Sequence, residues 1–333
     1  MLEKPKLKDG KVIHCLRKEY GLNIEKISFL PLGADVNTAV YRATAHDGTA
    51  YFAKLRRGAC SEASVAVPDH LASLGMKQII PPFKTLTGKL WADLDPFRVI
   101  LYPFVEGRDG FDNGMSKDQW IEFGRALKQF HSMQMPAEIT RGMPCEDFSP
   151  RWRESVKTFL ERIEHDAFED PVALEMADLL NKRKLEILDL IQQAEHFANI
   201  LQEKSPEFIV CHADIHEWNL FIDSSGALFL VDWDTLILAP KERDLMFIGA
   251  GLGDTGYTAQ EEERMFYKGY GRTEVDSIGI AYYRFARILE DIAAYCEQVF
   301  SSDDGGEDRK QAPGRVKANF LPNGTIERAY GGL

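Results

Sequence analysis

The residues that could do chemistry gather in the stretch FIVCHADIHEWNLFI, residues 208–222. Two apolar runs enclose several ionisable and polar side chains there, namely His212, Asp214, His216, Glu217 and Asn219. A buried polar group without a partner costs about 1–3 kcal/mol, and a plain tight turn would use Gly, Asn or Pro instead. The cluster is therefore typical of a functional site.

A zinc site is one interpretation. On a helix, His212 and His216 would share a face, with Asp214 and Glu217 nearby, as in zinc hydrolases. However, the flanking β-branched and aromatic runs predict a loop between strands, where a spacing of four has no special meaning. No third His or Cys follows at an informative distance. A polar β-turn without chemistry is a further alternative.

Phosphoryl transfer is the other functional interpretation. The stretch contains H-x-D-x-x-x-x-N, followed by a strand that ends in Asp232, which is the order found in kinases. Asp214 can orient an acceptor hydroxyl and take its proton. Asn219 and Asp232 offer hard oxygen ligands for Mg²⁺, which bridges nucleotide phosphates. His212 can fix the loop through backbone contacts.

Other kinase parts occur in the expected order. Lys54, in YFAKL on a predicted strand, is where a kinase keeps its phosphate-binding lysine. Its apolar neighbours indicate burial and hence a partner, for which Glu62 in the next predicted helix is the natural candidate. The loop 32–41 lies where a phosphate-covering loop belongs, although Gly33 is its sole glycine. A hinge at 102–107 would offer backbone groups to adenine.

The elements that must position these residues predict an α+β fold with two lobes. Residues 1–103 contain a helix that ends at Gly21, strand patterns and a second helix interrupted by Pro68, which should kink or split it. We expect a five-stranded antiparallel sheet here. Its predicted strands lie in KISFLPL, TAVYRATA, TAYFAKLR, IIPPFKTLTGKLWADL and FRVILYPFVEG.

Residues 104–333 are predicted to form a larger, mainly helical lobe. The stretch 208–232 is its one strongly strand-like segment, and 301–314 reads as a mobile polar loop. A helix with its N-cap at Ser116 should begin the lobe. Further helices are expected at 150–165, 171–204, 240–252, 258–270 and 276–299.

The composition of the chain limits the classes of binding partner. The chain has 333 residues, 44% hydrophobic and 28% charged, with a net charge of −12 and no Lys/Arg-rich block, which disfavours nucleic acid. No apolar run is long enough to span a membrane. The N-terminus does not resemble a secretory signal. The five cysteines contain no C-x-x-C pair, so we expect reduced thiols in a cytoplasmic protein.

CHADIHEWN and LVDWD match two stretches typical of the aminoglycoside phosphotransferase family. The chain resembles this family, which shares the bilobal protein-kinase-like fold. LAPKERDLMFIG, GADVNTAVY and PRWRE look most like its spectinomycin phosphotransferase branch. The resemblance implies a kinase that transfers the γ-phosphate of ATP (or GTP) to a hydroxyl of an aminocyclitol or aminoglycoside antibiotic.

The resemblance also implies roles for individual residues. Asp214 would be the catalytic aspartate, with Asn219 and Asp232 as metal ligands. Asp244 would support the catalytic loop and, like His212, be structural. Lys54 would contact the nucleotide phosphate, with Glu62 supporting it. The positions of the loop and the hinge in the chain add Gly33, Asn37, Thr38, Tyr102, Phe104 and Val105 as expected nucleotide contacts. The acceptor would be held by Glu217, Trp218, Asp234 and Glu242.

Expected partners are therefore Mg²⁺, the nucleotide and a small cationic acceptor, bound by a monomer or weak dimer. Within the fold, a metabolic kinase for choline, homoserine or a thioribose is the closest rival. A non-catalytic nucleotide-binding protein is disfavoured, because Lys54, Asp214, Asn219 and Asp232 are all present. A metal-dependent hydrolase is the remaining alternative.

Overall fold

The computed structural model describes residues 3–33, 35–58, 61–112, 114–249, 256–301, 306–322 and 324–331. The chain divides into two compact units. The first unit comprises Met1–Asn113, Met133–Met143 and Glu217–Leu236, and the second comprises Gly114–Ser132, Pro144–His216 and Ile237–Leu333. The chain therefore passes from the second unit to the first inside the polar cluster, between His216 and Glu217. The lobe boundary at residues 103 and 104 stays a prediction.

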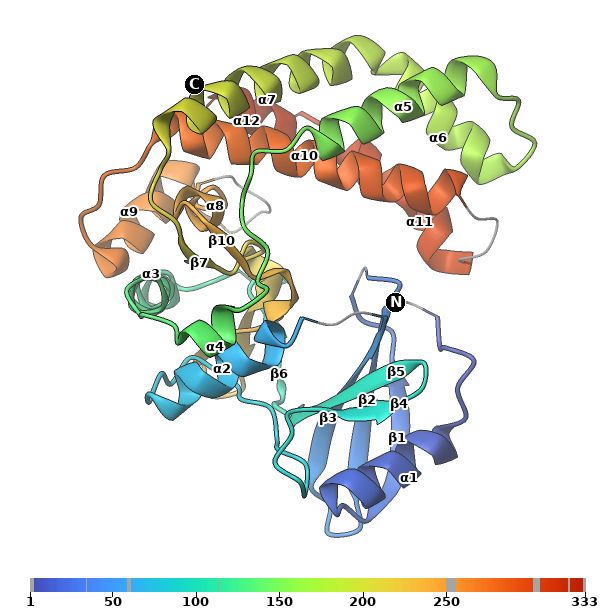
Figure 1. Cartoon of the computed structure of the whole chain (residues 1–333), viewed down its shortest axis with the longest axis vertical. Helices are drawn as coiled ribbons and strands as arrows, with labels where there is room; N and C mark the ends of the chain where they lie inside the picture. Colours follow the sequence, from blue (N-terminus) through green and yellow to red (C-terminus); the bar gives the residue numbers. More distant parts are fainter. Residues whose placement is uncertain are drawn as a thin grey trace. The chain divides into compact units, whose positions relative to one another are not determined.

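A five-stranded sheet is the main element of the first unit (Figure 1). Its order is β1-β2-β3-β5-β4, and all neighbouring pairs are antiparallel, as predicted. Of the segment 79–94, predicted as a strand, only the last three residues form one, and these are β4. The strands are β1 (Ile24–Leu30), β2 (Thr38–Ala45), β3 (Ala50–Arg57), β4 (Ala92–Leu94) and β5 (Phe97–Pro103).

Helix α1 (Asp9–Tyr20) packs into the core formed with this sheet. Val12, Leu16 and Tyr20 are buried and recur every four residues, the spacing of one helix face. Gly21 ends the helix in the left-handed conformation, with φ of 71°. Helix and sheet thus match the pattern expected from the sequence.

Helix α2 (Ala63–Ser73) follows β3 and runs through Pro68 without a break. We expected a kink or split, since proline lacks the N–H that the helix interior needs. The helix is not split. Pro68 is buried together with Val65, Val67 and Leu71, so apolar burial offsets the missing hydrogen bond.

A small sheet completes the first unit. Strands β8 (Leu220–Asp223) and β9 (Leu228–Leu230) form an antiparallel hairpin, and β6 (Gly107–Asp109) pairs with β8. The 3₁₀ turns η1 (Glu217–Asn219) and η2 (Trp233–Thr235) precede and follow this hairpin in the chain. The short helix α4 (Ala137–Thr140) belongs to the same unit.

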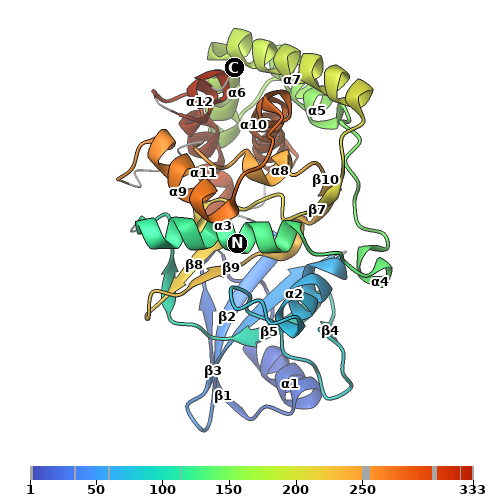
Figure 2. The same cartoon turned by 90° about the vertical axis from the view of Figure 1, so that its left-hand side faces the viewer.

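The second unit is mainly helical (Figure 2). Helix α3 (Lys117–His131) begins at the predicted N-cap, where Ser116 accepts a hydrogen bond from the Gln119 N–H in a capping box. Two short strands, β7 (Ile209–Cys211) and β10 (Ile237–Ala239), pair antiparallel. The other helices are α5 (Arg151–His165), α6 (Pro171–Lys182), α7 (Lys184–Lys204), α8 (Glu242–Leu245), α9 (Ala259–Tyr270), α10 (Ser277–Phe300), α11 (Gly306–Ala318) and α12 (Thr325–Gly331).

Several extents in this unit differ from the prediction. The segment 171–204 forms two helices, not one, and α8 covers four residues of the segment 240–252. The segment 301–314, predicted as a loop, lies largely in α11. Arg309 of α11 pairs with Asp170 at 2.8 Å in a partly buried contact, which the polar composition of the segment does not reveal. Residues 250–252 and 302–305 lie outside the described ranges.

Cys15, Cys145, Cys211 and Cys296 are free thiols in the described part of the chain. The reduced state expected in the cell stays a prediction. Cys60 lies outside the described residues. Within those residues, no helix combines the length and apolarity needed to cross a membrane.

Candidate active site

Lys54 lies on β3 and is almost buried. Its neighbours across the sheet are Val40 and Ile100, and the residue is 9% exposed. The Nζ atom lies 2.8 Å from Asp232 Oδ1 and 2.5 Å from Asp234 Oδ2. Burial by itself would lower the pKa of Lys54, but the two carboxylates raise it above its ordinary value. The ammonium group therefore stays charged.

Glu62 is not the partner of Lys54, contrary to our expectation. It lies at the N-cap of α2 and is exposed. In the described part of the chain, the ion pairs of Lys54 are those with Asp232 and Asp234. These two carboxylates already neutralise the buried ammonium, and a third would add like-charge repulsion. Support of the nucleotide by Glu62 stays a prediction.

Arg56 joins the same group and was not predicted. It lies two residues after Lys54 on β3, so both side chains leave the same face of the strand. Its Nη1 atom forms an ion pair with Asp234 and lies 3.4 Å from Asp35 Oδ2. The period of two along YFAKLRR could have revealed this second cation.

Asp35 organises the predicted phosphate-covering loop. The Asn37 N–H donates to Asp35 Oδ1 at 2.8 Å, and Thr38 Oγ1 donates to Asp35 Oδ2 at 2.7 Å. Gly33 has φ of 79°, which glycine adopts readily. Three predicted nucleotide contacts thus lie in a loop that Asp35 holds. Ala34 is outside the described residues.

The predicted hinge residues lie at and just after the end of β5, the strand that pairs with β3. Tyr102 pairs with Phe52 on β3. The Phe104 N–H donates to the Ala50 carbonyl oxygen at 3.3 Å, so this donor already has an acceptor in the protein. Adenine contacts by Tyr102, Phe104 and Val105 stay a prediction.

The two predicted metal ligands lie close in the backbone of the first unit. The Val231 N–H donates to the Asn219 carbonyl oxygen at 3.0 Å, immediately before Asp232 in the chain. Asp232 has φ of 63°, a conformation that side chains disfavour and that concentrates at functional sites. Its side chain is 49% exposed. Amide and carboxylate oxygens of this kind fit a Mg²⁺ ion.

Two predicted acceptor contacts precede Asn219. Glu217 is buried, whereas Trp218 is 46% exposed. The Trp218 ring stacks on Phe111, with centroids 3.9 Å apart and an interplanar angle of 25°. An exposed aromatic ring held by such a stack offers a flat apolar face to a ring. Phe111 is an addition to the predicted set.

In the second unit, Asp244 holds the loop that carries Asp214. Its buried carboxylate accepts hydrogen bonds from the N–H groups of His212 (2.9 Å) and Ala213 (2.6 Å). It also lies 2.8 Å from His131 Nε2. Burial opposes ionisation, but these partners hold the pKa of Asp244 below its ordinary value. The backbone around Asp214 is thereby pinned.

Asp214 itself contacts a cation from a distant helix. Arg287 of α10 places Nη1 2.5 Å from Asp214 Oδ1, and His216 Nε2 lies 3.3 Å from the same oxygen. Burial would raise the pKa of Asp214, but Arg287 and His216 hold it well below its usual range. The Asp214 N–H donates to His212 Nδ1 at 3.4 Å. Arg287 was not predicted, because it lies 73 residues from Asp214.

Glu242, the fourth predicted acceptor contact, is buried at the start of α8. Its carboxylate accepts a hydrogen bond from the Asp276 N–H at 3.1 Å, next to the first residue of α10. This bond connects two helices of the second unit. A role toward the acceptor stays a prediction.

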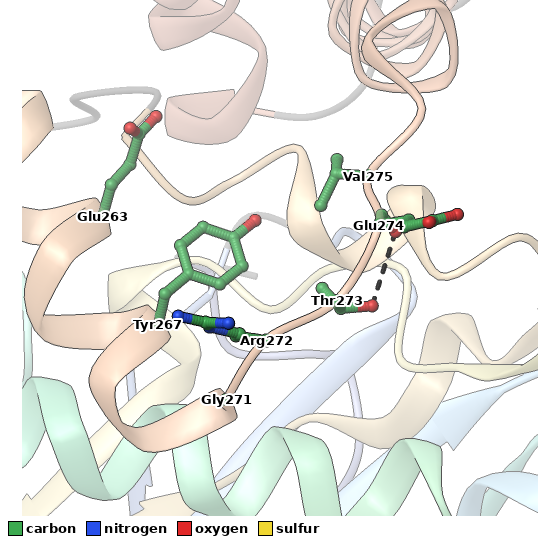
Figure 3. Close-up of a pocket in the computed structure, with 7 residues that line it drawn as sticks. All are labelled: Glu263, Tyr267, Gly271, Arg272, Thr273, Glu274 and Val275. Atoms are coloured by element: carbon green, nitrogen blue, oxygen red, sulfur yellow. Dashed lines mark hydrogen bonds between the residues drawn. The ribbon is translucent and has the colours of Figure 1, made fainter.

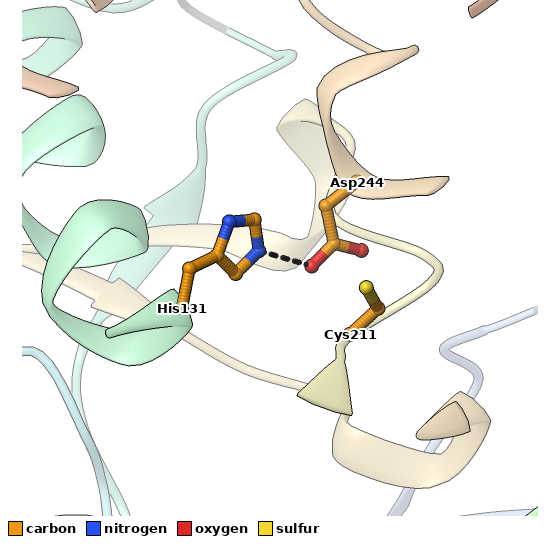
Figure 4. A group of neighbouring side chains, drawn as sticks. All are labelled: His131, Cys211 and Asp244. Atoms are coloured by element: carbon orange, nitrogen blue, oxygen red, sulfur yellow. Dashed lines mark hydrogen bonds and ion pairs between the residues drawn. The ribbon is translucent and has the colours of Figure 1, made fainter. Parts of the chain in front are cut away.

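A possible metal group in the described residues comprises His131, Cys211 and Asp244 (Figure 4). Their ligand atoms lie within 4.8 Å of one another, but each has protein partners. His131 contacts Asp244 and the Tyr270 hydroxyl, both at 2.8 Å. Burial raises the pKa of the Cys211 thiol well above its ordinary value, so a metal-binding thiolate is disfavoured. The group is a buried hydrogen-bond network.

A groove of ≈ 740 Å³ lies elsewhere in the second unit, where α9 ends and α10 approaches (Figure 3). None of the predicted site residues lines it. Its lining residues are Glu263, Tyr267, Gly271, Arg272, Thr273, Glu274 and Val275.

Comparison with known proteins identifies the family. The model of the phosphotransferase enzyme family matches residues 28–311. The chain belongs to this family. It is therefore a small-molecule kinase of the aminoglycoside phosphotransferase type, as the sequence motifs predicted. The alternatives of a metal-dependent hydrolase and a non-catalytic protein are not retained.

Solved structures agree with this assignment. A spectinomycin phosphotransferase in complex with ADP and spectinomycin is 34% identical, with 99% of each chain covered and a TM-score of 0.90. An AMP-bound spectinomycin phosphotransferase is 32% identical, covering 97% of this chain and 98% of that one, with a TM-score of 0.84. A choline kinase from Streptococcus pneumoniae is 14% identical, covering 97% and 99%, with a TM-score of 0.57, and shares the fold. None of the curated proteins compared matches the chain.

Proposed function

We propose that this phosphotransferase transfers the γ-phosphate of ATP to a hydroxyl group of spectinomycin or a closely similar aminocyclitol, giving resistance to the antibiotic. The observation that carries the proposal is the 34% identity, over 99% of both chains, to a spectinomycin phosphotransferase that binds ADP and spectinomycin. The net charge of −12 suits a cationic acceptor.

In this proposal, Asp214 orients the acceptor hydroxyl and receives its proton as the oxygen attacks the γ-phosphorus. Its low pKa is compatible with this role, because the transition state of phosphoryl transfer is loose and demands little base strength. Asn219 and Asp232 would hold Mg²⁺, which when bound neutralises phosphate charge. On nucleotide binding, the Lys54 ammonium would leave one of its carboxylate partners and pair with a phosphate.

We propose that four residues bind the acceptor, and their surroundings support this role to different degrees. They are Glu217, Trp218, Asp234 and Glu242. Trp218 is supported best, since its ring is exposed and stacked on Phe111. Asp234 is paired with Lys54 and Arg56, so it would need to release a cation before it could bind an ammonium group. Glu217 and Glu242 are buried and would act at short range.

The test is a turnover screen of the purified protein with Mg²⁺ and either ATP or GTP. Spectinomycin, kanamycin and choline serve as acceptors, and kcat/KM is measured for each. We expect spectinomycin to be preferred, because a pocket for a compact fused-ring acceptor leaves the extra rings of kanamycin unplaced. A preference for choline or kanamycin would overturn the acceptor while leaving the kinase family intact.

A further inference from the structure

Arg287 is built into the second unit as a fixed cation beside Asp214. Its Nη1 lies 2.5 Å from Asp214 Oδ1, while its Nε lies 3.0 Å from Asp291 Oδ1, one turn further along α10. The guanidinium also lies against the Phe247 ring, 5.9 Å from the centroid, and His216 meets the same ring edge-on. Arg287 is thus anchored on three sides.

The chemistry of a guanidinium limits what Arg287 can do. Arginine keeps its proton at every physiological pH, so it cannot relay the proton of the acceptor hydroxyl. It can hold an oxygen in place through a short, charge-assisted hydrogen bond. It can also repel another cation that approaches the same oxygen.

A cationic acceptor makes that repulsion useful. An ionised carboxylate in a partly buried site attracts ammonium groups more strongly than neutral hydroxyls. An ammonium bound to Asp214 would place the wrong group at the reacting phosphorus, and the acceptor would be held unproductively. The Arg287 guanidinium at Oδ1 disfavours this binding mode, because it repels a second cation.

We propose that Arg287 is a positioning residue that determines specificity: it holds Asp214 by Oδ1 and keeps acceptor ammonium groups from that oxygen, so that a hydroxyl meets the carboxylate. This inference rests on the proposed cationic acceptor. In the reaction, the hydroxyl oxygen bonds to the γ-phosphorus, the bond from that phosphorus to the β–γ bridging oxygen breaks, and the hydroxyl proton passes to Asp214. ADP leaves, and Arg287 keeps its proton throughout.

The experiment compares the parent with Arg287→Gln and Arg287→Lys in the full chain. Arg284→Gln is the matched control, because Arg284 also lies on α10 but donates to the carbonyl oxygens of Met246 and Ile248. For each protein, kcat and KM for spectinomycin are measured. The slow hydrolysis of Mg·ATP by water is measured separately, without acceptor, in methylammonium chloride and in sodium chloride at equal ionic strength.

We expect Arg287→Gln to lower kcat for spectinomycin by at least about tenfold and to lower KM with it, the pattern of unproductive binding. Methylammonium, but not sodium, should inhibit its ATP hydrolysis. Arg287→Lys should restore most of the parent behaviour, since it keeps the charge. Arg284→Gln should lower Tm while keeping the parent values of kcat and KM.

Arg287→Gln with parent kinetics and no inhibition by methylammonium would overturn the inference, as would identical changes in Arg284→Gln. A parent that hydrolyses ATP but does not phosphorylate spectinomycin would refute the proposed acceptor instead. The response of hydrolysis to methylammonium would still decide the role of Arg287 in that case.

Discussion

Each unit holds a group of paired charges, and the two groups are built differently. In the first unit, two cations from one strand, Lys54 and Arg56, meet Asp232 and Asp234. In the second unit, Arg287 of α10 meets Asp214 and also Asp291 of its own helix. In the first group both cations come from one strand, whereas in the second a single cation from a helix holds an aspartate that lies 73 residues away in the chain.

The difference between the two groups suggests which ion pairs would be exchanged when the substrates bind. Phosphate is an anion, so in the proposed function a nucleotide would replace carboxylates at Lys54 and Arg56, and the first group would exchange partners during turnover. In the proposed reaction Asp214 acts as a carboxylate toward a hydroxyl, so its pair with Arg287 can remain intact. We therefore expect substitutions in the first group to alter nucleotide affinity, and those in the second to alter the chemical step or stability.

Asp214→Asn should have the largest effect. Removing a positioned proton acceptor costs roughly 10²–10⁴-fold in rate, whereas the nearly isosteric amide preserves packing. We expect kcat to fall by that factor with the nucleotide Kd almost unchanged, as measured by steady-state kinetics and calorimetry. Turnover close to that of the parent would show that Asp214 is not the catalytic aspartate.

Asp244→Asn should reduce stability rather than nucleotide affinity. The buried Asp244 carboxylate accepts two backbone hydrogen bonds, and a hydrogen bond to a charged group contributes about 1.5–3 kcal/mol. The pKa of Asp244 lies below the unfolded value of about 3.9. Its stabilisation is therefore complete above about pH 4 and is lost as pH falls through the folded pKa.

The measurement is the free energy of unfolding of parent and Asp244→Asn, by denaturant titration at pH 7 and at a pH near 3. The difference between them should shrink at the lower pH. A difference that is small at pH 7, or equal at both, would argue against the buried carboxylate as the support of the loop.

Lys54→Met and Arg56→Met sharpen the contrast between the groups. Hydrogen bonds to charged groups contribute about 1.5–3 kcal/mol, so loss of a phosphate contact should raise the ATP KM by about tenfold or more. Arg57→Met is the matched control, because Arg57 is exposed and lies over the Phe97 ring. An ATP KM that responds equally in all three variants would remove the distinction between the two faces of β3.

Asp234→Asn and Glu62→Gln should have the smallest effects, and unequal ones. Asp234 is partly buried and paired with two cations, so its neutralisation should lower the free energy of unfolding by about 1–3 kcal/mol. Glu62 is exposed, and surface substitutions usually stay within about 0.5 kcal/mol. If Glu62→Gln proved the more destabilising, the partner assignment of Lys54 would be wrong.

Local sequence patterns determined much of this protein. The order of His212, Asp214, Asn219 and Asp232 identified the kinase-type loop, and the family match agrees with it. Strands β1, β2, β3 and β5 and the helix that ends at Gly21 were predictable as well, whereas β4 covers only the end of the predicted segment 79–94. Periodicity, caps and turn residues act over a few positions, so a single sequence displays them directly.

Tertiary structure alone decided which charges meet. Lys54 and Asp232 are separated by 178 positions in the sequence, and Asp214 and Arg287 by 73. Helix and strand periodicity gives no information about pairs so far apart in the chain. Helix α11 was missed for the same reason, since its polar segment is stabilised by the contact of Arg309 with Asp170. Removing two charges from water costs desolvation free energy. The attraction between the charges offsets this cost only when packing brings both partners together, and that depends on the whole fold.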